Sequence, residues 1–84
     1  MDMSDSTLEI LFFGRVADLV GRRALTLPLK LAPQTLFGLR ESLFSEMDYD
    51  IKTLRMSVNQ VVVLDDQPLK PGDEIAFFSV FSGG

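Results

Sequence analysis

The segment PQTLFGLRESLFSEM, residues 33–47, carries the longest helical pattern in the chain and decides how the rest can fold. Apolar residues recur in it at steps of three and four, which places them on one face of a helix. Proline suits the first turn of a helix and Thr35 can cap it, so the helix is expected to begin within residues 33–35. Gly38 weakens the helix by about 1 kcal/mol relative to Ala. The predicted apolar face consists of Leu36, Leu39, Leu43 and Met47.

Two strands are expected before this helix. Residues 8–13, LEILFF, form an apolar and aromatic run, and residues 24–27, ALTL, form a second one that ends at a proline. Between them, Val16, Leu19 and Val20 have helical spacing, and Gly21 is placed to cap a short helix. The connection between the two strands is therefore short.

Further strands are expected after the long helix. Residues 47–52 have the character of a loop, and residues 54–58 can begin the next strand. Residues 61–64, VVVL, are the strongest β-forming run of the chain, and residues 75–80, IAFFSV, form the last strand. Turns are expected at residues 65–68 and 70–73. The carboxylate pairs Asp65-Asp66 and Asp73-Glu74 lie in these turns and are not expected to be catalytic.

This order of elements predicts an α+β fold, with a mixed sheet wrapped around one main helix, as in the ubiquitin-like β-grasp. A ferredoxin-like arrangement has a compatible order, but the single long helix favours the β-grasp. Residues 1–7 are expected to be a flexible N-terminal segment, residues 8–79 the β-grasp domain, and residues 80–84 an extended C-terminal tail.

Charge and hydropathy narrow the classes of partner. The net charge is −4, and an acidic chain is repelled by phosphate backbones, so no nucleic-acid partner is expected. The charge instead favours a basic protein partner. No apolar run approaches the ~20 residues that a membrane span needs, and the polar, acidic residues 1–7 do not resemble a signal peptide. The sequence therefore predicts a cytoplasmic protein without a membrane partner.

The chain contains neither cysteine nor histidine. Without them it has no thiolate nucleophile, no general base that titrates near neutral pH and no common transition-metal ligand. We therefore expect no metal site and no catalytic turnover by the isolated chain.

The sequence ends in Ser82-Gly83-Gly84, directly after the last predicted strand. Two final glycines occur by chance in roughly 0.5% of chains at average glycine usage. Glycine adopts bent and extended backbone conformations and lets another backbone approach closely, which suits a tail that enters another protein's active site. A frayed end or an expression remnant is the alternative interpretation.

The residues just before this tail are candidate contacts for a partner. Phe77 and Phe78 must point to opposite faces of the last strand. If Phe77 is in the core, Phe78 is exposed unless a partner covers it, although core packing on both faces is the alternative. Val80 and Phe81 belong to a tail that is too short for a core of its own, so they are stronger candidates.

Three motifs resemble the small subunits of molybdopterin synthases. Residues 12–21 follow the pattern F-F-x-x-V-x-x-L-V-G, and residues 57–60, SVNQ, are similar to the family's A-V-N-Q. Residues 71–78, PGDEIAFF, with the final Gly-Gly, are similar to its D-G-D-E-V-A-F-F…G-G ending. One departure concerns residues 79–81, where Ser-Val-Phe replaces the usual P-P-V and removes prolines that would stiffen the tail.

The resemblance implies that the chain is a sulfur carrier without catalytic activity of its own. Gly84 would be adenylylated by a ubiquitin-activating-type adenylyltransferase that uses ATP, and a sulfur donor protein would convert it to a thiocarboxylate. The tail, with Gly83 and Ser82, would enter the large synthase subunit, in a heterotetramer of two small and two large subunits. Sulfur would pass there to cyclic pyranopterin monophosphate. The family's contacts also make Val62 a partner-binding residue, and the carrier itself would bind no cofactor.

Two related functions remain open at this point. Sulfur carriers of thiazole synthesis share the expected fold and the terminal diglycine, but they lack the F-F-x-x-V-x-x-L-V-G opening. A ubiquitin-like protein modifier would use the same adenylate to form isopeptide bonds with lysines.

Overall fold

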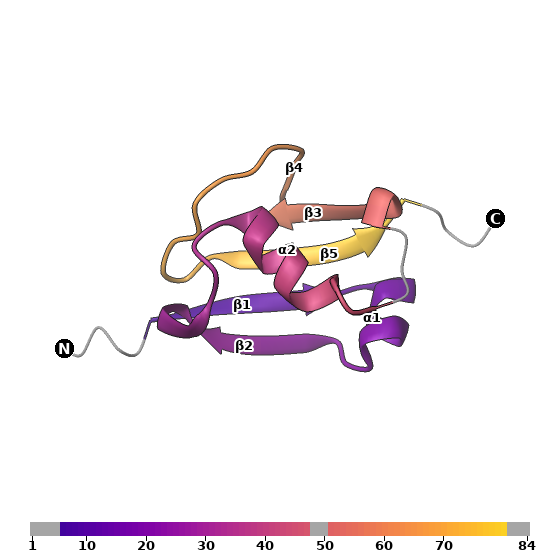
Figure 1. Ribbon diagram of the computed structural model, residues 1–84, viewed down its shortest axis with the longest axis horizontal. Helices are drawn as coiled ribbons and strands as arrows, with labels where there is room; N and C mark the ends of the chain where they lie inside the picture. Colours follow the sequence, from indigo (N-terminus) through magenta and orange to yellow (C-terminus); the bar gives the residue numbers. More distant parts are fainter. Residues whose placement is uncertain (1–5, 48–50, 81–84) are drawn as a thin grey trace.

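The computed structural model describes residues 6–47 and 51–80 (Figure 1). Within these residues the chain forms five strands, two α-helices and two short 3-10 helices. Their bounds are β1 Thr7–Phe12, α1 Gly14–Val20, β2 Ala24–Pro28, η2 Leu29–Leu31, α2 Leu36–Phe44, η3 Ile51–Thr53, β3 Leu54–Val58, β4 Val61–Val63 and β5 Glu74–Ser79.

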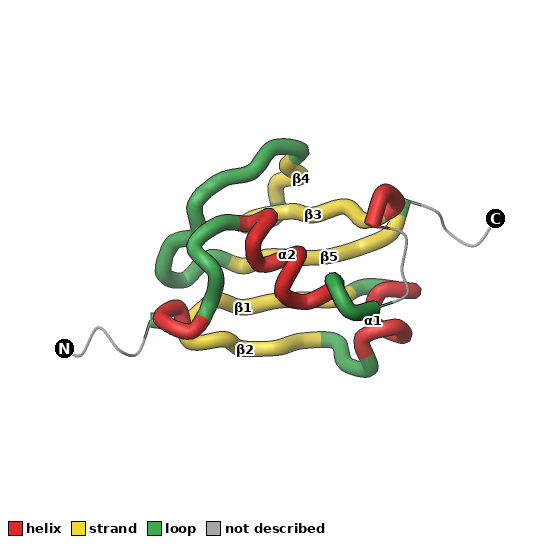
Figure 2. Tube along the Cα trace, in the orientation of Figure 1, coloured by secondary structure: helices red, strands yellow, loops and turns green. Residues whose placement is uncertain are grey.

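The five strands form one mixed sheet in the order β2-β1-β5-β3-β4. β1 and β5 are parallel at its centre, and the pairs β1–β2, β3–β5 and β3–β4 are antiparallel. α2 crosses one face of the sheet between β2 and β3 (Figures 1 and 2). This arrangement is the ubiquitin-like β-grasp, which confirms the predicted fold class and excludes the ferredoxin-like alternative.

The connection between β1 and β2 is the short helix that the sequence predicts. Gly21 ends α1 with a φ of 87°, and its N–H donates to the carbonyl oxygen of Ala17 at 2.8 Å. A left-handed residue at this position is a common helix ending and favours glycine. Val16 is the one residue of α1 that is fully buried, whereas Leu19 remains exposed.

The start of α2 also follows the prediction. The hydroxyl oxygen of Thr35 accepts a hydrogen bond from the N–H of Gly38 at 3.1 Å, which satisfies one of the free donors of the first turn. Close packing is a second feature of this turn, and it favours glycine at position 38. A Cβ atom at this position would lie 3.1 Å from Cβ of Pro33 and 3.2 Å from Oγ1 of Thr35.

The C-terminal end of α2 differs from the prediction. The helix ends at Phe44, so Met47 lies beyond it, and Met47 and Leu43 are only partly buried against the core. Phe44 is buried instead, because its ring fills the space between α2 and the sheet. The ring lies edge-on to Phe77 at a centroid distance of 5.1 Å and to Phe12 at 6.4 Å. Spacing along the helix identifies the face but not the size of the gap beneath its last turn.

The core consists of alternate residues of the central strands, packed beneath α2, together with Leu36 and Leu39 of the predicted helix face and Val16 of α1. Its completely buried members are Leu8, Ile10, Val16, Leu36, Leu39, Ile75 and Phe77.

A polar network joins the β3–β4 hairpin to the turn before β5. Asp73 is only 7% exposed, and its two carboxylate oxygens accept hydrogen bonds from Nδ2 of Asn59 and the N–H of Lys70, both at 2.9 Å. Oδ1 of Asn59 accepts from the N–H of Glu74 at 3.0 Å. Asp73 is therefore a structural carboxylate that joins the hairpin to this turn.

Candidate functional site

The candidate site lies at the carboxyl end of β5, the central strand. β5 is held on both sides, by β1 in parallel and by β3 in antiparallel pairing, with Ser79 opposite Leu54. The N–H of Val80 donates to the carbonyl oxygen of Thr53 at 3.0 Å, so ordered hydrogen bonding extends one residue beyond the strand. The predicted tail residues Phe81, Ser82, Gly83 and Gly84 lie outside the described residues. The fold therefore fixes the point from which the tail departs.

Phe77 and Phe78 occupy opposite faces of β5, as strand alternation requires. Phe77 is completely buried beneath α2, and its ring stacks on that of Phe12 at a centroid distance of 6.0 Å. Phe78 lies on the sheet face away from α2, which we call the open face, and it is partly buried there. It stands opposite Arg55 of β3.

Two other predicted contact residues are exposed. Val80 is 47% exposed at the root of the tail, and Val62 is 59% exposed on β4. Val62 pairs with Ser57, which in turn pairs with Ala76 of β5, so Val62 and Phe78 share the open face on either side of β3. The open face thus joins these apolar side chains to the start of the tail.

Phe13 is an apolar residue of the same region that sequence reasoning missed. It is 51% exposed, and its N–H donates to the carbonyl oxygen of Phe77 at 3.1 Å. Phe12 is opposite Phe77 in the parallel register, so the next residues, Phe13 and Phe78, are neighbours on the open face. Phe12 and Phe13 alternate in the same way as Phe77 and Phe78, so the same rule could have identified Phe13 as an exposed residue of this face.

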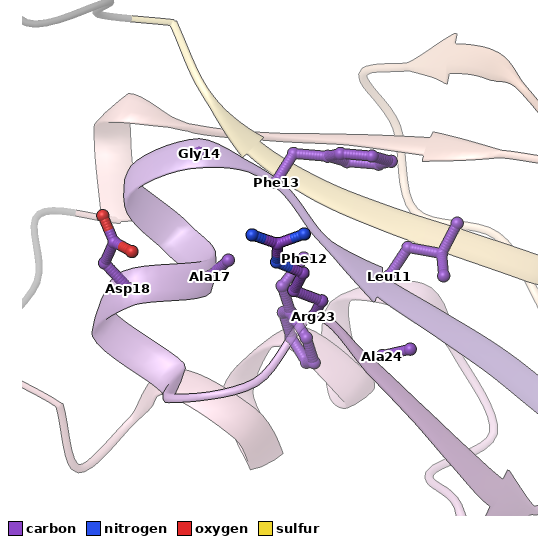
Figure 3. A pocket seen from close by; sticks show the side chains of 8 residues that line it. All are labelled: Leu11, Phe12, Phe13, Gly14, Ala17, Asp18, Arg23 and Ala24. Atoms are coloured by element: carbon purple, nitrogen blue, oxygen red, sulfur yellow. The ribbon is translucent and has the colours of Figure 1, made fainter.

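A pocket of about 590 Å³ lies beside Phe13, between the end of β1, α1 and the start of β2 (Figure 3). Figure 3 shows the side chains of Phe12 and Phe13 leaving the chain in different directions, with the Arg23 guanidinium beside Ala17. Asp18 is the carboxylate of this pocket, and Leu11 and Ala24 add apolar surface. The residues that line the pocket include one cation, one anion and two phenylalanines.

The described residues contain no group of three acidic or histidine side chains that could hold a metal ion. The same residues include no helix that is both long enough and apolar enough to cross a membrane. What the arrangement provides is a rigid central strand, an apolar surface beside its carboxyl end and a defined point of departure for the tail. Such an arrangement can present a chain end to another protein.

The fold and this site define a ubiquitin-like β-grasp protein. The chain belongs to the ThiS family, whose model matches residues 10–84. It is 34% identical over 82 residues to the molybdopterin synthase sulfur carrier subunit of Escherichia coli K12, covering 92% of this chain and 99% of that protein. Among solved structures it is similar to SAMP1 from Haloferax volcanii, with a TM-score of 0.62 and 23% identity over 93% of this chain and 99% of the other. The likeness to SAMP1 concerns the fold alone.

Proposed function

We propose that this chain is a sulfur carrier subunit of molybdopterin synthase and that sulfur is carried on the carboxyl group of Gly84. The observation that carries the proposal is the 34% identity to a sulfur carrier subunit along almost all of that relative's length. The family match also runs to residue 84, so it includes the two glycines.

The chemistry of a carboxylate explains why activation is required. A carboxylate is a poor electrophile because its negative charge repels nucleophiles. In the proposed cycle, a carboxylate oxygen of Gly84 attacks the α-phosphorus of ATP on an activating enzyme and releases pyrophosphate. The terminal sulfur of a persulfide on a donor protein then attacks the carbonyl carbon and expels AMP, which gives an acyl disulfide. A thiol cleaves the S–S bond of this intermediate by exchange, which releases the thiocarboxylate and leaves a disulfide on the donor. Cysteine is absent from the chain, so sulfur has no thiol side chain to travel on.

The fold contributes positioning rather than catalysis. Residues 74–79 are held between two strands, and Val80 is tied to Thr53, so the tail begins at a fixed place on a rigid body. A glycine at the last two positions lets the backbone enter a narrow channel without a side chain. The acid–base groups for sulfur transfer would belong to the partners.

The partner proposed for sulfur transfer is the large synthase subunit, with cyclic pyranopterin monophosphate as the acceptor. Phe78, Val62 and Val80 on the open face are proposed contacts, and Phe13 extends the same apolar surface. Burial of such side chains at an interface increases the affinity for the partner, although these side chains are not part of the hydrophobic core of the isolated chain. Assembly into a heterotetramer in the cytoplasm is part of the same proposal.

Deletion of Gly84 tests the proposal. The truncated chain should keep its fold, because every hydrogen bond and core contact described above lies within residues 6–80, but it should lose sulfur transfer. Circular dichroism measures the fold, and molybdopterin production in a strain that lacks the endogenous carrier measures function. Retained production would refute the terminal mechanism. Accumulation of lysine-linked conjugates instead of a sulfurated chain would identify a protein modifier.

A further inference from the structure

A basic groove lies at the edge of the molecule where α2 stops covering the sheet. It has a volume of about 280 Å³ and opens between α2, β3 and β4. Three basic residues line it, each from a different element: Arg40 of α2, Lys52 of η3 and Arg55 of β3. No acidic residue is among the described residues that line it. A chain of net charge −4 thus gathers three of its eight basic residues around one groove.

Two of these cations are held in place by the protein. The guanidinium carbon of Arg40 lies 4.1 Å from the centroid of the Phe37 ring, and its Nε is buried without a hydrogen-bond partner. Nη1 of Arg55 donates to the carbonyl oxygens of Lys52 at 3.0 Å and Leu54 at 3.1 Å. Both bonds of Arg55 use the same nitrogen, so further N–H donors remain for an external acceptor. A guanidinium that is already fixed loses less freedom when it binds an anion.

The rest of the groove is apolar and borders an edge strand. Leu54 and Val63 contribute to its lining, and Leu64, which is 76% exposed, extends it toward solvent. β4 is the last strand of the sheet and pairs only with β3 among the described residues. The outer edge of a terminal strand presents N–H and C=O groups to which another extended chain can pair.

We propose that the basic groove and the outer edge of β4 bind an extended, acidic segment of a partner protein. The segment would add to the sheet beside β4, and its alternate side chains would point into the groove. The carboxylates would point into the groove and pair with the guanidinium groups of Arg40 and Arg55, and the intervening apolar side chains would lie on the open face beside Val62. The net charge of the molecule predicts a basic partner, whereas the basic residues of this groove favour a negatively charged segment at this one place.

The groove lies close to the root of the tail. Lys52 immediately precedes Thr53, whose carbonyl oxygen accepts from Val80, and Arg55 stands opposite Phe78. Figure 1 shows η3 at the same end of the sheet as the carboxyl end of β5. The inference that this partner also receives the tail rests on the proposed function. The inference that the groove binds an acidic strand does not depend on the proposed function.

Nuclear magnetic resonance of the 15N-labelled full chain tests the inference. The probe is an acetylated and amidated peptide of four Glu-Val repeats, with the Lys-Val peptide of equal length and ATP as comparison ligands. The Glu-Val peptide should shift the amide signals of residues 52–56 and 61–64 in a saturable way, and less strongly as salt is raised. The Lys-Val peptide should leave these signals unchanged.

Matched charge variants complete the test. Arg40→Gln/Arg55→Gln should bind the Glu-Val peptide about tenfold more weakly than the unsubstituted chain. Arg22→Gln/Lys30→Gln removes the same charge outside the groove and should bind as the unsubstituted chain does. Dispersed amide spectra of both variants would show that they remain folded. If a variant does not fold, the shift map of the unsubstituted chain still tests the inference.

Three results would overturn the inference: no saturable shift at these residues, equal weakening by both double variants, or saturation of the groove by ATP in place of the peptide. The experiment uses neither an activating enzyme nor a synthase, so failure of the groove leaves the sulfur-carrier proposal intact. Conversely, a chain that never carries sulfur would still bind the peptide.

Discussion

Truncation of the two adjacent phenylalanines of β5 separates the core from the proposed interface. Phe77 is completely buried and contacts the rings of Phe12 and Phe44 at centroid distances of 6.0 and 5.1 Å. Phe77→Ala should therefore lower the free energy of unfolding by about 3–5 kcal/mol. A domain of this size loses about 4–8 °C of melting temperature per kcal/mol, so the expected decrease is at least about 12 °C. Phe77→Leu, which keeps most of the volume, should be less destabilising.

Phe78→Ala should have the opposite profile. Phe78 is only partly buried on the open face, so the expected loss of stability is about 1 kcal/mol. Burial of a phenylalanine side chain by a partner is worth about 1.5–3 kcal/mol, which corresponds to a loss of affinity of about tenfold or more. Thermal unfolding and calorimetric titration with the large synthase subunit measure the two quantities on the same protein. A large loss of stability with unchanged affinity would refute the assignment of Phe78 to the interface.

Three further predictions concern stability and are checked by urea denaturation. Asn59→Ala should destabilise the protein by about 1–3 kcal/mol, because the buried carboxylate of Asp73 loses a donor; no change would exclude a structural role for this network. Gln60 has a φ of 72° in the two-residue β3–β4 connection, so Gln60→Gly should stabilise by about 0.5–1 kcal/mol, and a loss of stability would contradict a strained backbone there. Thr35→Ala should cost about 1 kcal/mol whereas Thr35→Ser should cost less; equal losses would show that the cap of α2 contributes nothing.

The features that the sequence predicted correctly depend on local rules. Gly21 ends α1 because a left-handed residue is needed there, and Thr35 caps α2 through its hydroxyl oxygen. The alternation of a strand required Phe77 and Phe78 to lie on opposite faces, and three strands follow one long helix as a β-grasp requires. Each of these follows from a short segment of chain.

The features that the sequence did not predict depend on contacts between distant segments. Phe44 is buried because the rings of Phe12 and Phe77, from two different strands, lie beneath it. Asp73 is buried because Asn59, fourteen residues earlier, supplies a donor. The basic groove likewise joins Arg40 to Arg55 from separate elements. Neither spacing nor composition reveals which residues of separate elements will meet.

The intact mass of the chain isolated from cells that make molybdopterin is the most direct test of the central claim. A fraction of the protein should have one sulfur in place of one oxygen, located at Gly84 by fragmentation of the C-terminal peptide. The same species should be absent from a chain that lacks Gly84 and present in the Phe78→Ala chain, whose terminus is unchanged. A sulfur-free mass in cells that depend on this carrier for the cofactor, or sulfur located at any other residue, would contradict the account.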